Sequence, residues 1–198
     1  MTTSHQQLSR LCAECYQRSD FEESNIEVVV QKSLDTGGAV FAFRGTDEPL
    51  DALRNIRFLP VWTREVGWCP AGFLKASKRL VNKVTSVCLE QDIDHKAIEL
   101  TGHSLGGAVA LIVGALMTRD EVPPLQVVTF GAPRCGRLKI LDEVPVTQYR
   151  NGKDIVPLVP PLMRRHNKLL EYGKPGKGYI KDHFMLNYVK MKKSPEIY

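Results

Sequence analysis

Long apolar runs are missing from this 198-residue chain, and none approaches the roughly 18–20 residues that a membrane-spanning helix needs. The opening stretch, MTTSHQQLSR, also lacks the apolar segment of a secretory signal peptide. We therefore expect no signal peptide and, by default, a cytoplasmic protein, with export by another route left open.

Cysteine is scarce and odd in number, because the chain has 5 cysteines. Such a count does not describe a disulfide framework in a chain of this size. Cys12 and Cys15 form a C-x-x-C pair, but neither a second pair nor a His-x-x-His partner accompanies it. The pair is a weak zinc signal. We interpret both cysteines as helix residues, keep metal binding as the less favoured alternative, and expect no metal or other cofactor.

Acidic residues are fewer than basic ones, 22 against 27, which gives a net charge of +5. Basic residues cluster at Arg164, Arg165, Lys190, Lys192 and Lys193. These clusters could make a transient contact with an anionic membrane or lipid surface, although a solvated surface is the simpler interpretation of each. Aromatic residues do not interleave with them, as base stacking would require, so we expect no nucleic-acid partner.

The composition, 43% hydrophobic and 25% charged, is that of a soluble globular domain. Turn signals separate runs of strand and helix character that alternate along the chain. We expect strands at 25–33, 39–45, 95–102, 125–133 and 146–151, and helices at 4–18, 72–90 and 108–117. With no internal repeat and no linker, the pattern predicts one α/β domain over residues 1–198, with a mostly parallel central sheet and flanking helices.

The sequence TGHSLGG at 101–107 lies between an expected strand and an apolar helix. Ser104 could simply cap that helix. A G-x-S-x-G sequence in this setting is instead typical of a nucleophile elbow, a sharp turn that presents the serine hydroxyl above the sheet. Gly102 and Gly106 would be needed because side chains there would clash with the neighbouring strand and helix. The combination of strand, motif and helix favours Ser104 as a nucleophile.

A serine nucleophile needs a histidine base, and in α/β-hydrolases the chain order is serine, acid, histidine. Only His166 and His183 follow Ser104. His166 lies in RRHNK, where neighbouring positive charges disfavour an imidazolium. His183 is therefore the better candidate base.

Asp154 is the best candidate for the acid that orients the histidine. It follows the expected strand VTQYRN, and open α/β sheets collect functional groups at the carboxyl ends of their strands. Asp182 is adjacent to His183, but neighbouring residues seldom turn their side chains toward each other. The other acids considered lie in polar, helix-end or loop contexts and resemble surface charges: Asp120, Glu121, Asp142 and Glu143.

An oxyanion hole needs preorganised donors, one of which is the backbone N–H of the residue after the nucleophile, here Leu105. The second donor is expected from the loop after an earlier strand, and AVFAFRGT places Thr46 at the end of such a strand. Thr46 could offer its N–H and its hydroxyl there, although a simple turn residue is the alternative for R-G-T alone.

Several segments together resemble the class 3 (fungal-type) lipase family of α/β-hydrolases. The matching sequences, in the family's order, are FAFRGT, NIRFLP, GF, TGHSLGGAVA, VVTFGAPRCG, YRNGKDIVPLVPP and HF. The resemblance covers roughly residues 39–188 and implies a compact single-domain α/β-hydrolase.

The resemblance implies the same roles for the same residues. Ser104 would be the nucleophile, Asp154 the acid and His183 the base, with Thr46 and Leu105 forming the oxyanion hole. It places His166, followed by Glu171 and Tyr172, at a second, non-catalytic histidine, and it gives His103 a structural role.

The resemblance also implies a lid over residues 47–62. An amphipathic lid is compatible with Leu50, Leu53 and Ile56, although Ala52 occupies the place expected for a lid tryptophan. A fixed surface helix is the alternative for this segment.

We therefore expect a serine hydrolase that cleaves carboxylic esters of lipids through an acyl-enzyme, a triacylglycerol-lipase-like activity without a cofactor. Two alternatives stay open. One is a phospholipase A1-type activity, which the basic C-terminal residues favour slightly. The other is a non-catalytic, lipase-like module that binds a lipid or a protein partner. The sequence does not fix the preferred ester or the oligomeric state.

Overall fold

The computed structural model describes residues 2–33, 36–45, 59–173, 176 and 178–190. Its strands are β1 Phe21–Glu23, β2 Ile26–Lys32, β3 Ala39–Phe43, β4 Pro60–Thr63, β5 Gly67–Pro70, β6 Ile98–His103, β7 Gln126–Phe130, β8 Val146–Asn151 and β9 Leu169–Tyr172. Its α-helices are α1 His5–Glu14, α3 Ala71–Glu90, α4 Leu105–Arg119 and α5 Met185–Val189. Short 3-10 helices occur at His95–Ala97, Lys139–Leu141, Val156–Leu158 and Lys181–His183.

Seven strands form one sheet in the order β1-β2-β3-β6-β7-β8-β9. In this sheet β1 pairs antiparallel with β2, and β2 with β3. The remaining pairings, β3 with β6, β6 with β7, β7 with β8 and β8 with β9, are parallel. The expected mostly parallel α/β sheet with flanking helices is therefore confirmed. Because β6, β7 and β8 run in the same direction, the loops that follow them meet at one end of the sheet.

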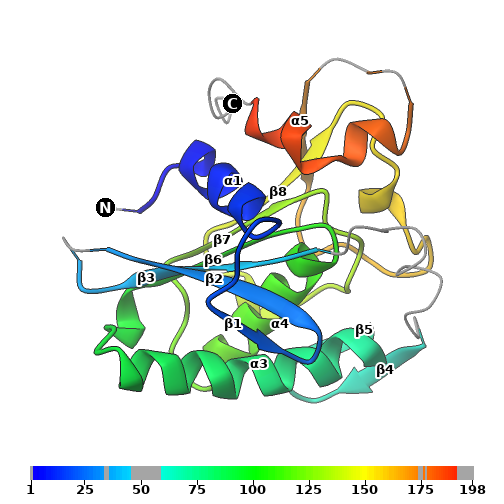
Figure 1. The fold of residues 1–198 in the computed structure, drawn as a ribbon. Coiled ribbons are helices and arrows are strands. Elements are labelled where there is room, and N and C mark those ends of the chain that lie inside the picture. The colour runs from blue at the N-terminus through cyan, green and yellow to red at the C-terminus, as the bar shows by residue number, and fades with distance from the viewer. Residues whose placement is uncertain (1, 34–35, 46–58, 174–175, 177, 191–198) are drawn as a thin grey trace.

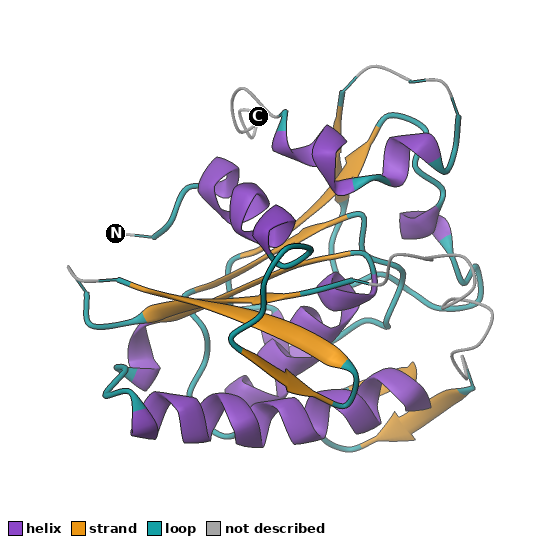
Figure 2. Cartoon of the chain, in the orientation of Figure 1, coloured by secondary structure: helices purple, strands orange, loops and turns teal. Residues whose placement is uncertain are grey.

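Helices cover both faces of this sheet (Figure 1). α3 and α4 pack on one face, and α1 and α5 lie next to each other on the other face. Each face has its own apolar core, one built largely from α3, α4 and the strand residues that face them, and the other from α1, α5 and the opposite strand faces. Figure 2 shows the same layers by secondary structure.

The two helices of the first face have different sequence patterns for a physical reason. In α4 every residue from Gly106 to Met117 is buried, which explains why its sequence is apolar on all sides. The sequence of α3 is amphipathic, with Phe73, Leu80 and Val84 among its buried residues and its lysines on the outer face. None of the described helices is both long enough and apolar enough to span a membrane.

Some elements differ from the expected ones. The strand expected over 95–102 begins only at Ile98, because His95–Ala97 form a 3-10 turn whose N-terminus is capped by the Asp94 side chain. The short strands β1 and β9 extend the sheet at its two edges. β4 and β5 form a separate hairpin just before α3.

All five cysteines are buried free thiols. Cys12 lies in α1, where its Sγ is 3.3 Å from Thr101 Oγ1, and Cys15 caps the end of that helix and donates to the Ala42 carbonyl at 3.2 Å. Burial raises the pKa of the Cys15 thiol to about 12 and that of Cys135 to about 12. The C-x-x-C pair thus packs α1 against the sheet, as protonated thiols.

Candidate active site

Ser104 occupies a sharp turn between β6 and α4. Its backbone has φ 55° and ψ −128°, a region that residues other than glycine rarely adopt. A Cβ atom at Gly102 would lie 2.4 Å from the Gly106 carbonyl oxygen, and one at Gly106 would lie 2.1 Å from that of Phe43. Since a Cβ atom does not approach a nonbonded carbonyl oxygen so closely, the turn requires glycine at both positions.

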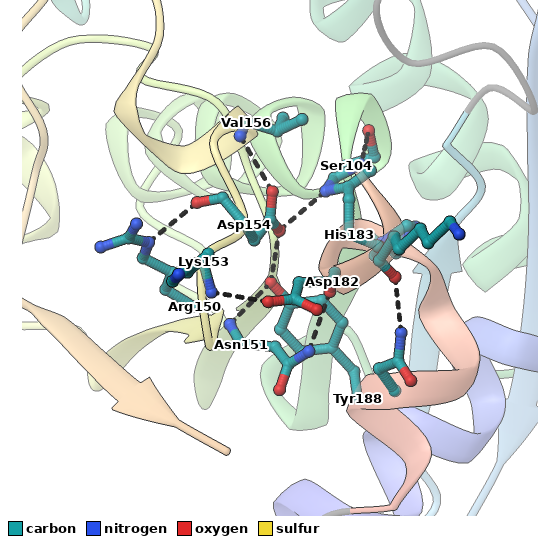
Figure 3. Close-up of polar contacts among 12 residues, drawn as sticks. Ser104, Arg150, Asn151, Lys153, Asp154, Val156, Asp182, His183 and Tyr188 are labelled. Carbon is teal, nitrogen blue, oxygen red and sulfur yellow. Dashed lines mark hydrogen bonds and ion pairs between the residues drawn. The ribbon is translucent and has the colours of Figure 1, made fainter. Parts of the chain in front are cut away.

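The Ser104 side chain does not cap α4, although the residue stands at the N-cap position of that helix in the described structure. Its Oγ instead lies 2.9 Å from Nε2 of His183, as Figure 3 shows. Ser104 is 1% exposed and His183 is 2% exposed, so this contact is shielded from water. The helix-cap interpretation of Ser104 is thereby excluded in favour of a serine–histidine pair.

Asp154 completes a hydrogen-bonded chain with these two residues. Its Oδ2 lies 2.8 Å from His183 Nδ1, and its Oδ1 accepts the Val156 N–H at 2.9 Å (Figure 3). The carboxylate fixes the histidine tautomer, because Nδ1–H donates to it and Nε2 is left to accept the serine proton. The loop is held from the other side by Arg150, whose Nε donates to the Asp154 carbonyl at 2.8 Å.

Tyr188, in α5, is a further residue of the site that the sequence does not reveal. Its hydroxyl donates to Asp154 Oδ2 at 2.6 Å and accepts the Asn151 N–H at 3.0 Å (Figure 3). Burial, together with the charge of Asp154, raises the pKa of Tyr188 well above its usual value. The phenol therefore stays protonated and supplies a third hydrogen bond to the carboxylate.

His103 supports the catalytic histidine from behind. Its Nε2 donates to the His183 carbonyl at 2.8 Å, and its Nδ1 lies 2.7 Å from the Tyr16 hydroxyl. Burial and the neighbouring His183 lower the pKa of His103 well below its usual value. His103 is thus a neutral structural histidine that connects the elbow, the end of α1 and the backbone of His183, in agreement with the role that the resemblance implied.

The expected oxyanion donors have different positions in the structure. Leu105 is the first residue of α4, and its N–H has no acceptor among the described residues. It is available, at the positive end of the helix, to a ligand beside Ser104. Thr46 lies outside the described residues.

Most of the segment expected as a lid, residues 47–58, also lies outside the described part. Pro60 to Trp62 at its end belong to strand β4, where they pair with β5.

His166 and Asp182, which were the less favoured candidates for the base and the acid, contact other residues. His166 Nδ1 accepts a hydrogen bond from Arg137 at 2.9 Å. Burial, and to a smaller extent the charge of Arg137, lowers the pKa of His166. The Asp182 carboxylate is buried and accepts the N–H groups of Lys153 and Gly176, at 2.8 and 2.9 Å. Asp182 thereby fixes the loop that carries His183 while Asp154 contacts the ring.

A family model for lipase (class 3) matches residues 40–163 of the chain. The chain belongs to the class 3 lipase family. The lipase of Rhizopus niveus is 35% identical over 135 residues, which are 60% of this chain and 34% of that protein. Secreted mono- and diacylglycerol lipase 1 of Fusarium solani is 36% identical over 155 residues, 73% of this chain and 46% of that protein.

The solved structure of lipase II from Rhizopus niveus has the same fold. It aligns with a TM-score of 0.60 at 27% identity, over 73% of this chain and 59% of that chain. This class 3 lipase family member spans about a third to a half of the length of the two curated relatives, with 34% and 46% covered. The family match ends at residue 163, so the position of His183 is known from the geometry of the site rather than from the match.

Proposed function

We propose that this chain hydrolyses carboxylic esters of lipids through a covalent acyl-enzyme. The observation that carries the proposal is the continuous chain Ser104 Oγ to His183 Nε2 to Asp154 Oδ2, with distances of 2.9 and 2.8 Å. Membership of the class 3 lipase family and the names of the relatives support a lipid ester as the substrate.

In the proposed first step, Ser104 Oγ attacks the ester carbonyl carbon and His183 Nε2 takes the serine proton. The negative charge on the carbonyl oxygen is stabilised by the Leu105 N–H and, we expect, by Thr46. The tetrahedral intermediate collapses as the C–O bond to the alcohol breaks, and His183 returns the proton to that alcohol. A water molecule then repeats the sequence on the acyl-serine, which releases the fatty acid and regenerates Ser104.

An active-site-directed fluorophosphonate tests the nucleophile. The unchanged chain should be labelled, Ser104→Ala should not, and the matched control Ser86→Ala, which alters an exposed serine on α3, should be labelled like the unchanged chain. Labelling of Ser104→Ala at the same rate would refute the assignment. His183→Ala should lower kcat by about a thousandfold or more. A loss of that size in His166→Ala instead would move the base to His166.

The substrate class is tested by fatty-acid release from triacylglycerol, diacylglycerol, phosphatidylcholine and a short soluble ester. Preference for the glycerides supports the proposed lipase activity, and preference for phosphatidylcholine would replace it with a phospholipase A1-type activity. Absence of turnover on every ester by the folded chain would favour the non-catalytic module.

A further inference from the structure

The hairpin β4–β5 carries both tryptophans of the chain on one surface. Trp62 and Trp68 are directly opposite each other in the antiparallel pairing, so their side chains share a face. They are 61% and 58% exposed. The adjacent pair, Val61 and Cys69, faces the other way and packs on the core beneath α3. The hairpin is therefore anchored by one face and presents two indole rings with the other.

Beside these rings the surface forms a hollow of about 800 Å³. Its walls are the hairpin and two segments, residues 136–140 and 162–164. Gly136 joins the walls, because a Cβ atom there would lie 1.9 Å from the Trp68 carbonyl oxygen and its N–H donates to the Arg164 carbonyl at 3.0 Å. Leu162, at the rim, is 96% exposed. Gly136 thus holds two walls of the hollow together, and Leu162 adds an exposed apolar side chain beside the two indoles.

The charges around the hollow are predominantly positive. Arg64, Lys139 and Arg164 line it and are exposed, and none of them forms an ion pair with another described residue. The remaining charges at the hollow are compensated locally, since Glu65 pairs with Lys78 at 2.9 Å and Arg137 contacts Asp142. Within the described residues, three cations without an ion pair therefore lie around the two indoles. We define the hairpin face by Trp62, Trp68, Leu162, Arg64, Lys139 and Arg164.

The hairpin face lies at the same end of the molecule as the elbow. α3 begins directly after β5 and leads, through a crossover, to the start of β6, whereas Ser104 follows the end of β6. Figure 1 accordingly shows the hairpin at the end of α3 toward which β6 points. None of the residues Ser104, Asp154 and His183 lines the hollow. It is a surface distinct from the catalytic chain of hydrogen bonds.

We propose that the hairpin face docks onto a bilayer that contains acidic phospholipid. Indole rings prefer the headgroup level of a bilayer, where their apolar body and polar N–H are both accommodated. Each arginine or lysine near an anionic membrane surface adds further attraction. Exposed apolar side chains beside cations that pair with no acid in the described part of the chain match this occupant, whereas an acidic protein or a nucleic acid would satisfy only the cations. The proposal extends the proposed function, but it does not depend on turnover.

Intrinsic fluorescence is a selective test, because both tryptophans of the chain belong to the hairpin face. The measurement uses Ser104→Ala, so that lipids are not hydrolysed. On mixed phosphatidylcholine–phosphatidylglycerol vesicles the emission should shift to the blue, resist acrylamide and be quenched by brominated acyl chains. Pure phosphatidylcholine vesicles should bind more weakly. Co-sedimentation gives the partition coefficient independently of the fluorescence.

Charge and aromatic variants separate this surface from a general effect of net charge. Arg64→Gln/Lys139→Gln/Arg164→Gln should weaken partitioning onto the mixed vesicles about a hundredfold, at roughly fivefold for each cation. The control Arg10→Gln/Lys32→Gln/Lys96→Gln removes the same charge from exposed sites elsewhere and should weaken it much less. Trp62→Ala should weaken it about tenfold, with Trp62→Phe intermediate.

Any of four outcomes would overturn the proposal. The two triple variants could lose binding equally, the vesicles could bind without any change in tryptophan emission, or the mixed vesicles could fail to bind at all. Binding to soluble polyglutamate as strong as to vesicles would point instead to an acidic protein. Every measurement uses the Ser104→Ala chain, which has no turnover. A negative result for membrane docking therefore does not argue against the proposed ester hydrolysis. If ester hydrolysis were refuted, the docking result could still be interpreted.

Discussion

Replacement of Tyr188 by phenylalanine removes one hydrogen-bond donor from Asp154 without opening a cavity. The hydroxyl donates to Asp154 Oδ2 at 2.6 Å, and Tyr188 is fully buried. The carboxylate keeps its contacts with His183 Nδ1 and with the Val156 N–H. The ring of phenylalanine fills the same space, so the change isolates the contribution of the O–H group.

The expected effect on activity follows from the charge on the carboxylate. With one donor removed, the negative charge of Asp154 is less compensated and attracts a protonated His183 more strongly. Since only neutral His183 can accept the serine proton, the acid limb of the kcat/KM profile should move to higher pH. A hydrogen bond to a charged group contributes about 1.5–3 kcal/mol, and one pH unit corresponds to about 1.4 kcal/mol. Because only part of this free energy is transmitted to His183, we expect the acid limb to move by about half to one pH unit.

The same change should lower stability. The Asn151 N–H, which the hydroxyl accepts at 3.0 Å, loses this partner in the buried site. An unsatisfied buried donor costs about 1–3 kcal/mol. Urea unfolding at neutral pH, with the pH profile of kcat/KM on a soluble ester, measures both effects on one preparation.

Tyr149→Phe is the matched control for this prediction. Tyr149 is equally buried, and its hydroxyl lies 2.7 Å from His5 Nδ1, away from the hydrogen bonds of Asp154. It should lower stability by a similar amount and leave the acid limb unmoved. An acid limb that moves to lower pH in Tyr188→Phe, or that moves equally in both variants, would refute the account of Tyr188 as a donor to Asp154.

Two further predictions concern the elbow. Burial lowers the pKa of His103 far below that of an unfolded-state histidine, so the unfolded chain binds more protons below about pH 6.5 and stability falls as the pH falls. His103→Gln should flatten this dependence by up to about 1.4 kcal/mol per pH unit in urea titrations between about pH 7 and pH 5, and an unchanged slope would contradict it. Gly106→Ala places a Cβ atom 2.1 Å from the Phe43 carbonyl oxygen and should cost about 3 kcal/mol or more, read as a lower Tm. A fully stable Gly106→Ala variant would show that the elbow relaxes.

Much of the fold is predictable from the sequence because its central elements have strong local patterns. The apolar run of α4 and the β-branched residues of β2 are by themselves sufficient to indicate buried elements. Chain order also limits the candidates for the catalytic base and acid, since only two histidines follow Ser104 and one aspartate directly follows a strong strand candidate. In the structure Asp154 and His183 meet beside Ser104.

Other features depend on contacts that the sequence does not encode locally. β9 has four residues and becomes a strand only because β8 offers an edge. Tyr188 and Tyr16 contact the site from opposite ends of the chain, and nothing in their neighbourhoods marks them. The β4–β5 hairpin has no clear sequence signal, because β4 begins with proline and overlaps the segment expected as a lid.

The order of synthesis gives the position of His183 a biological consequence. Strands β1 to β8, with the elbow and α4, precede residue 152, whereas His183 and Tyr188 follow β9. α1 also packs against α5, so α1 lacks this neighbour until α5 has been synthesised. A nascent chain would therefore carry a serine without a proton acceptor. Under the proposed mechanism, it stays unable to attack the lipids around it until α5 docks.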